Sequence, residues 1–180
     1  MRMVILDRDG VINYDSEKFI KSPDEWLPIP GSLEAIARLS QSGFRVVLAS
    51  NQSGVGRGLF DMTTLNKIHD KLYRAVGLAG GRIDAFFYCP HTQMANCDCR
   101  KPKIGMFREI AERFNISLEK VPAIGDSLRD LQAASKAGAL PILVRTGKGE
   151  KTLSEGNIPS ETLVFSELGE ATKYLIEQIK

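Results

Sequence analysis

The sequence lacks several features that would assign it to a membrane, secreted or nucleic-acid-binding class. No apolar run approaches the roughly 20 residues that a helix needs to cross a bilayer. Only four apolar residues (3–6) stand between the first charged residues, too few for the apolar core of a signal peptide. The formal net charge of +2 is too small to indicate binding to nucleic acid or to a membrane surface. We therefore expect a cytoplasmic protein with a small-molecule partner.

Internal repeats, low-complexity segments and linkers are absent as well. A chain of 180 residues with 43% hydrophobic and 26% charged residues is long enough to bury a core and has the composition of a globular domain. These properties predict a single domain over residues 1–180, and we expect it to be a monomer.

The cysteines are few and crowded. All three lie within residues 89–99, and an odd, clustered set is unlike a disulfide framework. With one of the two histidines they form the pairs Cys89-x-His91 and Cys97-x-Cys99. Four nitrogen and sulfur ligands that leave no position for water are typical of structural Zn²⁺. Free thiols buried in a core are the alternative, but the polar residues between the pairs disfavour it. A redox role for these cysteines is disfavoured, because their spacing is CxC rather than CxxC.

Apolar runs of strand length alternate with amphipathic helical segments. The predicted strands are residues 3–6, 44–49, 83–88, 121–124, 140–144 and 162–165. The predicted helices are residues 32–42, 63–76, 106–114, 127–137 and 167–179, and residues 146–159 are expected to be a loop. This alternation predicts an α/β fold with a parallel sheet and helices on both faces.

Polar clusters follow four of these strands. They are Asp7-Arg8-Asp9-Gly10, residues 50–54 (SNQSG), Arg100-Lys101-Pro102 after the cysteines, and residues 125–130 (GDSLRD). Ligands of such sheets bind outside the carboxyl ends of the strands. Crowded carboxylates need a cation, and all-oxygen ligands suit Mg²⁺. Each cluster alone would be read as a turn, a polar loop or a helix cap, but their common position favours a site for phosphoryl transfer.

The order DxD, then Ser, then Lys, then GDxxxD resembles the haloacid dehalogenase (HAD) superfamily of phosphohydrolases. The fuller patterns DRDGVIN, SNQSGVGRG, CPH…CDCRKP and GDSLRDLQAA look like its branch of heptose-bisphosphate and histidinol-phosphate phosphatases. This resemblance spans residues 3 to about 148. It implies a three-layer α/β/α Rossmann-like fold without a large cap domain, in which a zinc-stapled loop (residues 89–103) holds Arg100 and Lys101.

The resemblance also implies a role for individual residues. Asp7 would be the nucleophile and Asp9 the general acid and base, while Ser50 and Lys101 would stabilise the phosphoryl group. Mg²⁺ would be held by Asp7, Asp9 and Asp126, with Asp130 in support, and Zn²⁺ by Cys89, His91, Cys97 and Cys99. The expected substrate contacts are Asp15, Ser16, Glu17, Lys18, Asn51, Gln52, Ser53, Arg100 and Ser127.

The substrate implied is a heptose 1,7-bisphosphate, cleaved at the C7 phosphate through an aspartyl-phosphate on the route to lipopolysaccharide core. Arg57 and Arg100 could bind its second phosphate, although Arg57 could equally be plain surface charge. Histidinol phosphate is the first alternative, because the acidic residues Asp15, Glu17, Asp24 and Glu25 would suit a cationic substrate. A zinc-stabilised binding protein without activity is the second, but such a protein would be expected to have lost Asp7 or Asp9.

Two further residues are expected to have structural rather than catalytic roles. His69 is expected to be a surface or partly buried residue of its helix. Trp26, in the Pro-rich segment 22–31, is expected to pack over the edge of the sheet, although it could border the substrate.

Overall fold

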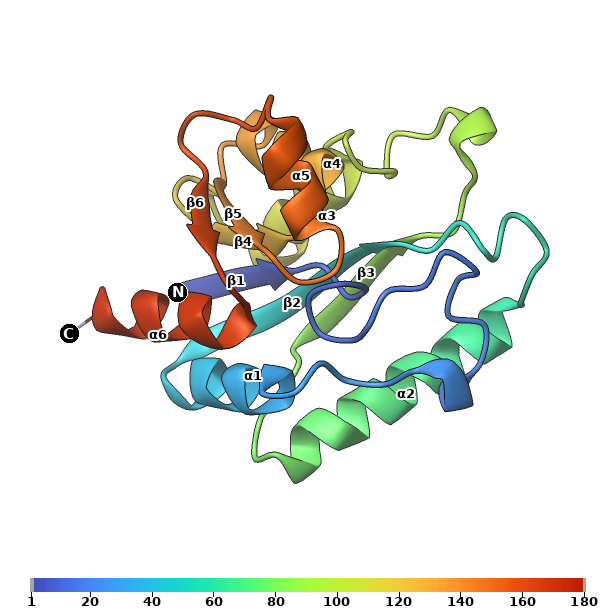
Figure 1. Cartoon of the computed structure of the whole chain (residues 1–180), viewed down its shortest axis with the longest axis horizontal. Helices are drawn as coiled ribbons and strands as arrows, with labels where there is room; N and C mark the ends of the chain where they lie inside the picture. The colour runs from blue at the N-terminus through green and yellow to red at the C-terminus, as the bar shows by residue number, and fades with distance from the viewer. Residues whose placement is uncertain (1, 180) are drawn as a thin grey trace.

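A computed structural model describes residues 2–179 of the chain. Its centre is a six-stranded parallel sheet with the strand order β3-β2-β1-β4-β5-β6 (Figure 1). The strands are β1 (Arg2–Leu6), β2 (Phe44–Asn51), β3 (Ala85–Cys89), β4 (Pro122–Gly125), β5 (Leu140–Val144) and β6 (Leu163–Phe165). The helices are α1 (Ser32–Gln41), α2 (Met62–Leu78), α3 (Gly105–Phe114), α4 (Leu128–Lys136), α5 (Gly149–Glu155) and α6 (Leu168–Glu177), with short 3-10 turns at Pro23–Glu25 and Gln93–Ala95.

Helices cover both faces of the sheet, so the expected three-layer architecture is confirmed (Figure 1). Successive side chains of a strand point to opposite faces, and β1 shows this directly. Val4 and Leu6 pack with α1, α2 and α6 in one core cluster, whereas Met3 and Ile5 pack with α3 and α4 in a second cluster on the other face. Strands buried on both faces must be apolar throughout, which is why they were recognisable in the sequence.

No cap domain covers the carboxyl edge of the sheet within residues 2–179, and no helix in that range is long and apolar enough to cross a membrane. The loops that follow β1, β2 and β3 therefore border this edge directly. The loop after β3, which contains Cys97 and Cys99, extends away from the sheet (Figure 1).

The prediction of a loop over residues 146–159 was wrong, because it contains α5. This seven-residue helix has one large apolar residue, Leu153, so it shows no helical periodicity. It is held instead by contacts with the site loops. The Thr152 hydroxyl donates a hydrogen bond to the carbonyl oxygen of Asp126 at 2.8 Å, and Gly149 lies so close to the carbonyl of Val144 that a Cβ would clash with it.

His69 is more deeply buried than expected, because only 8% of its surface is exposed. Its ring stacks on Phe86 of β3 with centroids 4.8 Å apart. The burial is favoured by the helical position, since α2 turns this face toward the sheet. Trp26 is 1% exposed and belongs to the core cluster beneath α1 and α2, as expected for a packing residue.

Candidate active site and metal centres

Strand ends place the main site residues next to one another. Asp7 follows β1 directly, Ser50 lies near the end of β2, and Asp126 follows β4. Because β1 pairs with both β2 and β4, these three residues meet at the middle of the carboxyl edge. All three are buried, with exposures of 8%, 2% and 3%. β2 runs two residues farther than predicted, so Ser50 and Asn51 are fixed by pairing with β3 rather than carried on a loop.

Lys101 lies beside Asp7 in the same buried position. Its Nζ is 3.2 Å from Oδ1 of Asp7 and 2.7 Å from Oδ1 of Asp130, and it donates a hydrogen bond to the carbonyl oxygen of Ala49 at 2.7 Å. Its backbone is held by Asn51, whose side chain accepts from the Lys101 N–H at 3.0 Å and donates to its carbonyl at 3.1 Å. The predicted substrate contact Asn51 therefore uses both ends of its amide to fix Lys101.

Asp7, Asp126 and Asp130 form a cluster whose carboxylate oxygens lie within 4.8 Å of one another. Burial raises the pKa of Asp7 to about 6, against the lowering effect of Lys101. Burial, Asp130 and Asp7 together raise the pKa of Asp126 to about 8. Carboxylates that repel one another in this way are stabilised by a cation, and oxygen ligands suit Mg²⁺. The cluster thus fits a magnesium site and contains the predicted ligands Asp7 and Asp126, with Asp130 in support, whereas the carboxylate of the third predicted ligand, Asp9, is not part of it.

Two glycines shape the surroundings of Asp126. Gly10 (φ 82°) and Gly147 (φ 58°) have left-handed backbones, and a Cβ on either would lie 2.0 or 2.2 Å from Oδ2 of Asp126. That oxygen also accepts a hydrogen bond from the backbone N–H of Lys148 at 2.8 Å. Glycine is required at both positions, because only a residue without a side chain allows the loops after β1 and β5 to close on this carboxylate.

Asp130 supports the site from the first turn of α4. Its Oδ2 accepts from the backbone N–H and the hydroxyl of Ser127, forming a capping box at the start of the helix. Its Oδ1 faces Lys101. Charge from Lys101 and Arg129 outweighs burial and lowers the pKa of Asp130. Ser127, a predicted substrate contact, is not among the residues that line the catalytic cleft, and its hydroxyl donates to Asp130.

Asp9 is held by a buried network that the motif alone did not reveal. Arg8, with no exposed surface, donates from Nε at 3.0 Å and from Nη2 at 2.9 Å to Oδ1 of Asp9. Asn13 and Gln52 each add a hydrogen bond at 2.9 Å. Burial raises the pKa of Asp9, but Arg8, Asn13 and Gln52 together lower it. Gln52 also donates to the hydroxyl of Ser50 at 2.8 Å, so it links the acid–base residue to the residue expected to bind the phosphoryl group.

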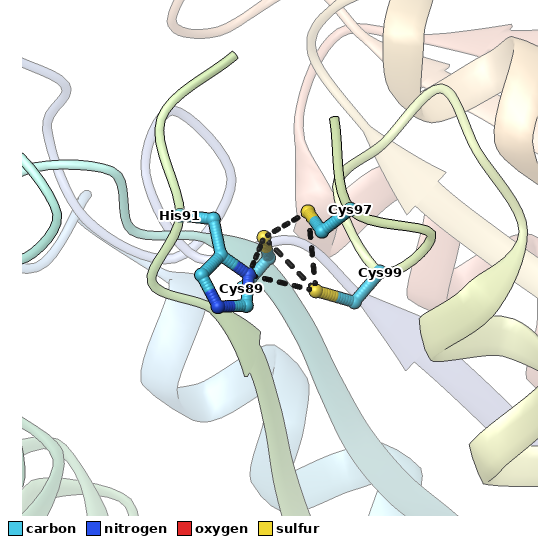
Figure 2. A group of neighbouring side chains, drawn as sticks. All are labelled: Cys89, His91, Cys97 and Cys99. Atoms are coloured by element: carbon cyan, nitrogen blue, oxygen red, sulfur yellow. Dashed lines mark hydrogen bonds between the residues drawn. The ribbon is translucent and has the colours of Figure 1, made fainter. Parts of the chain in front are cut away.

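The four predicted zinc ligands converge at one point (Figure 2). The three sulfur atoms lie 3.2–3.5 Å apart, and Nδ1 of His91 lies 3.6 Å from Sγ of Cys89 and 3.4 Å from Sγ of Cys99. A tetrahedron with Zn–S distances of about 2.3 Å has sulfur atoms about 3.8 Å apart. The observed spacing is only slightly smaller, so the donor set and its shape fit Zn²⁺.

The catalytic cleft, of about 220 Å³, is lined by most of the predicted substrate contacts. Beside Asp7, Asp9 and Asp126 these are Asp15, Ser16, Glu17, Asn51, Gln52, Ser53 and Arg100. Lys18 is exposed and does not line it. The lining also contains Phe19, Ile20, Arg57, Arg129 and Lys148. Of these, Arg129 lies inside the GDSLRD motif and could have been noticed, whereas Lys148 is brought in by the loop before α5.

Comparison with known proteins agrees with this site. A family described as HAD-hydrolase-like matches residues 98–171. The D-glycero-beta-D-manno-heptose-1,7-bisphosphate 7-phosphatase of Bordetella bronchiseptica is 56% identical, with 99% of each chain covered. That of Pseudomonas putida is 52% identical over 98% of this chain and 100% of the relative. A crystal structure of the B. bronchiseptica D,D-heptose 1,7-bisphosphate phosphatase with magnesium and phosphate superposes with a TM-score of 0.98 over 99% of each chain, at 56% identity. The chain therefore belongs to the family of D-glycero-beta-D-manno-heptose-1,7-bisphosphate 7-phosphatases, within the HAD-like hydrolases.

Proposed function

We propose that this protein is a Mg²⁺-dependent phosphatase that removes the C7 phosphate of D-glycero-β-D-manno-heptose 1,7-bisphosphate and releases heptose 1-phosphate. It would act as a cytoplasmic monomer in the synthesis of nucleotide-activated heptose for lipopolysaccharide core. The observation that carries the proposal is the buried group of Asp7, Lys101 and Asp126 at the carboxyl ends of β1 and β4. The β anomer is proposed because the relatives described above are named for it.

The chemistry begins with Asp7. One of its carboxylate oxygens attacks the C7 phosphorus and forms an aspartyl-phosphate as the bond from phosphorus to the C7 oxygen breaks. Lys101 and the hydroxyl of Ser50 bind the phosphoryl oxygens and stabilise the charge that develops on them. Mg²⁺, held by Asp7, the backbone carbonyl of Asp9 and Asp126, would supply further positive charge to the same oxygens.

Asp9 moves the protons. It donates one to the departing C7 oxygen and takes one from the water that hydrolyses the aspartyl-phosphate. The lowered pKa of Asp9 keeps it a carboxylate before substrate arrives. The first proton therefore enters with the substrate monoester, whose second pKa is about 6, and the proton taken from water passes to the released phosphate, which returns Asp9 to a carboxylate.

Zn²⁺ would contribute by fixing the position of the loop that precedes Arg100 and Lys101. Cys89, His91, Cys97 and Cys99 would hold Zn²⁺, which closes the loop whose next two residues are Arg100 and Lys101. A loop of this length without a core of its own would otherwise be mobile, and phosphoryl transfer requires Lys101 to be fixed relative to Asp7.

The charges around the cleft favour the bisphosphate over histidinol phosphate. Asp15, which would suit a cationic substrate, is paired with Lys148 at 3.0 Å. Asp24 and Glu25 do not line the cleft, and Glu25 pairs with Lys21. Glu17 also lines the cleft and has no ion-pair partner among the described residues, but three guanidinium groups, those of Arg57, Arg100 and Arg129, line it without a carboxylate partner, and these suit a second phosphate.

Phosphorus NMR of the reaction tests the proposal. With Mg²⁺ present, the signal of the C7 phosphate should disappear while that of the C1 phosphate remains. The variant Asp7→Asn, which retains the shape of the side chain and loses the nucleophile, should be folded and inactive. Release of the C1 phosphate, or substantial turnover by Asp7→Asn, would contradict the proposal.

A further inference from the structure

His69 is a buried titratable residue that the proposed mechanism does not use. It lies on α2, and its ring stacks on Phe86 and tilts against Tyr88, with centroids 4.8 and 5.7 Å apart. Its Nε2 is buried and has no hydrogen-bond partner among the described residues. Leaving a buried polar nitrogen unpaired is costly, so this atom points to a contact beyond the packing of the ring.

Arg8 lies in the same layer of the protein as His69. Side chains alternate between the faces of a strand, and β1 turns Val4 and Leu6 toward the core cluster that also contains residues of α1 and α2. Arg8 is two residues beyond Leu6, so the alternation directs it to the same face, where it is completely buried. Phe86, on which His69 stacks, packs against this same cluster.

The charges of Arg8 and Asp9 both act on the imidazole of His69. Burial and the charge of Arg8 lower the pKa of His69 to about 3, against the raising effect of Asp9. Coulomb forces fall with distance, so the ring lies near this pair. The imidazole is therefore neutral at neutral pH, and one of its two nitrogens is a hydrogen-bond acceptor.

The guanidinium of Arg8 has a free donor that complements this acceptor. Nε and Nη2 of Arg8 donate to Oδ1 of Asp9 at 3.0 and 2.9 Å, and Nη2 also donates to Oε1 of Gln52 at 3.1 Å. Nη1 is buried and, within residues 2–179, has no hydrogen-bond partner. Buried polar groups of opposite kind are commonly joined by one ordered water.

We propose that His69 is a positioning residue for Asp9, in which Nε2 of His69 accepts a hydrogen bond from one bound water that itself accepts from Nη1 of Arg8. This inference rests on the proposed function, in which Asp9 is the general acid and base. His69 is not among the residues that line the catalytic cleft. It acts through Arg8, whose two hydrogen bonds to Oδ1 orient the carboxylate of Asp9.

The role predicts which part of the reaction His69 supports. A general acid must lie within hydrogen-bond reach of the oxygen that it protonates. A guanidinium held only by Asp9 and Gln52 can tilt, and the carboxylate of Asp9 then tilts with it. Attack by Asp7 on phosphorus does not require this carboxylate to be oriented. Loss of the acceptor on His69 therefore impairs protonation of the leaving oxygen more than formation of the aspartyl-phosphate.

Two variants separate positioning from packing. His69→Phe keeps a ring that can stack on Phe86 and removes the acceptor, whereas His69→Gln removes the ring and keeps an acceptor. With heptose 1,7-bisphosphate, whose C7 oxygen needs a proton to leave, His69→Phe should lose about tenfold in kcat/KM and His69→Gln less than about threefold. With 4-nitrophenyl phosphate, whose leaving group departs as a stable phenolate, both variants should stay within about threefold of the wild type.

Three results of these measurements would overturn the proposal. If His69→Gln loses activity and His69→Phe keeps it, the ring only packs. If His69→Phe loses equally on both substrates, the damage is to the fold or to the attack by Asp7. If it retains full kcat/KM with the bisphosphate, Asp9 needs no support from His69. A wild-type protein that hydrolyses 4-nitrophenyl phosphate but not the bisphosphate refutes the proposed function instead, and histidinol phosphate then serves as the alkyl substrate in the same comparison.

Nitrogen NMR of the imidazole tests the contact without turnover. An acceptor at Nε2 requires the proton of the neutral ring to be on Nδ1. The wild-type protein at neutral pH should therefore show His69 as the Nδ1–H tautomer. The Nε2–H tautomer, or a charged imidazole, would refute the proposal whatever the activity of the variants.

Discussion

Replacing Lys101 with methionine removes one buried charge at the centre of the site and nearly preserves the length of the side chain. In the wild-type protein Nζ lies 3.2 Å from Oδ1 of Asp7 and 2.7 Å from Oδ1 of Asp130, and 2% of the residue is exposed. The variant leaves two buried carboxylates without their cation. Removal of one partner from a buried ion pair costs about 3–5 kcal/mol.

The pH dependence of this loss has a definite sign. Without Lys101, the folded-state pKa of Asp7, already raised to about 6 by burial, rises further, and the pKa of Asp130, which Lys101 lowers, rises above its unfolded value of about 3.9. The native state then binds more protons than the unfolded state, so the free energy of unfolding of the variant falls as the pH rises. We expect a loss of about 3 kcal/mol at pH 8 and a clearly smaller loss at pH 5, where the carboxylates can take up protons.

Urea unfolding at the two pH values, without added Mg²⁺, measures the stability, and phosphate release with saturating Mg²⁺ measures the activity. Loss of a group that stabilises transition-state charge should lower kcat/KM by about 10²- to 10³-fold. Lys67→Met, an exposed lysine on α2, should stay within about 0.5 kcal/mol of the wild type and retain full activity. The reasoning is refuted if Lys101→Met unfolds like the wild type at pH 8, or if its kcat/KM is unchanged.

Three other changes test the zinc loop, the magnesium site and the core. Cys97→Ser should lose bound zinc by elemental analysis and lower both thermal stability and kcat/KM, and full zinc content would contradict the assignment. Gly10→Ala, whose Cβ would lie 2.0 Å from Oδ2 of Asp126, should weaken Mg²⁺ activation by about tenfold or more, and an unchanged Mg²⁺ titration would argue against that cradle. Burial and the charge of Arg8 lower the pKa of His69 to about 3, below its unfolded value of about 6.5, so stability is lost as the pH falls from 6.5 toward 3. His69→Phe should remove about 2 kcal/mol of the loss between pH 7 and pH 5 in urea unfolding, and an unchanged pH slope would show that His69 does not cause it.

The residues at the strand ends were predictable from the sequence for a physical reason. A strand buried on both faces must be continuously apolar, so its end is marked by the first polar residue, as at Asp7 and Asp126. Parallel strands then bring those ends to one edge. The zinc ligands were equally readable, because their chemistry depends on residue type and short spacing rather than on distant contacts.

The missed features depend on partners far away in the chain. Arg8 looks like a surface residue within its motif, yet it is completely buried and donates a hydrogen bond to the side-chain oxygen of Gln52, which lies in a different loop. Asn51 lines the cleft, but its second role, in which its side chain fixes the backbone of Lys101 farther along the chain, was not predicted. The helix α5 has no periodicity of its own and forms on contacts with residues around Asp126. No local pattern encodes such pairings.

The central claim is that this active site selects a heptose bisphosphate, and the ratio of kcat/KM values for D-glycero-β-D-manno-heptose 1,7-bisphosphate and histidinol phosphate tests it most directly. Both substrates present a primary phosphate to Asp7, so the ratio reports recognition of the rest of the molecule. We predict a preference of about 10²-fold or more for the bisphosphate, about 3 kcal/mol of differential transition-state binding. Equal values, or a preference for histidinol phosphate, would contradict the account of the substrate while leaving Asp7, Asp9 and Lys101 in their roles.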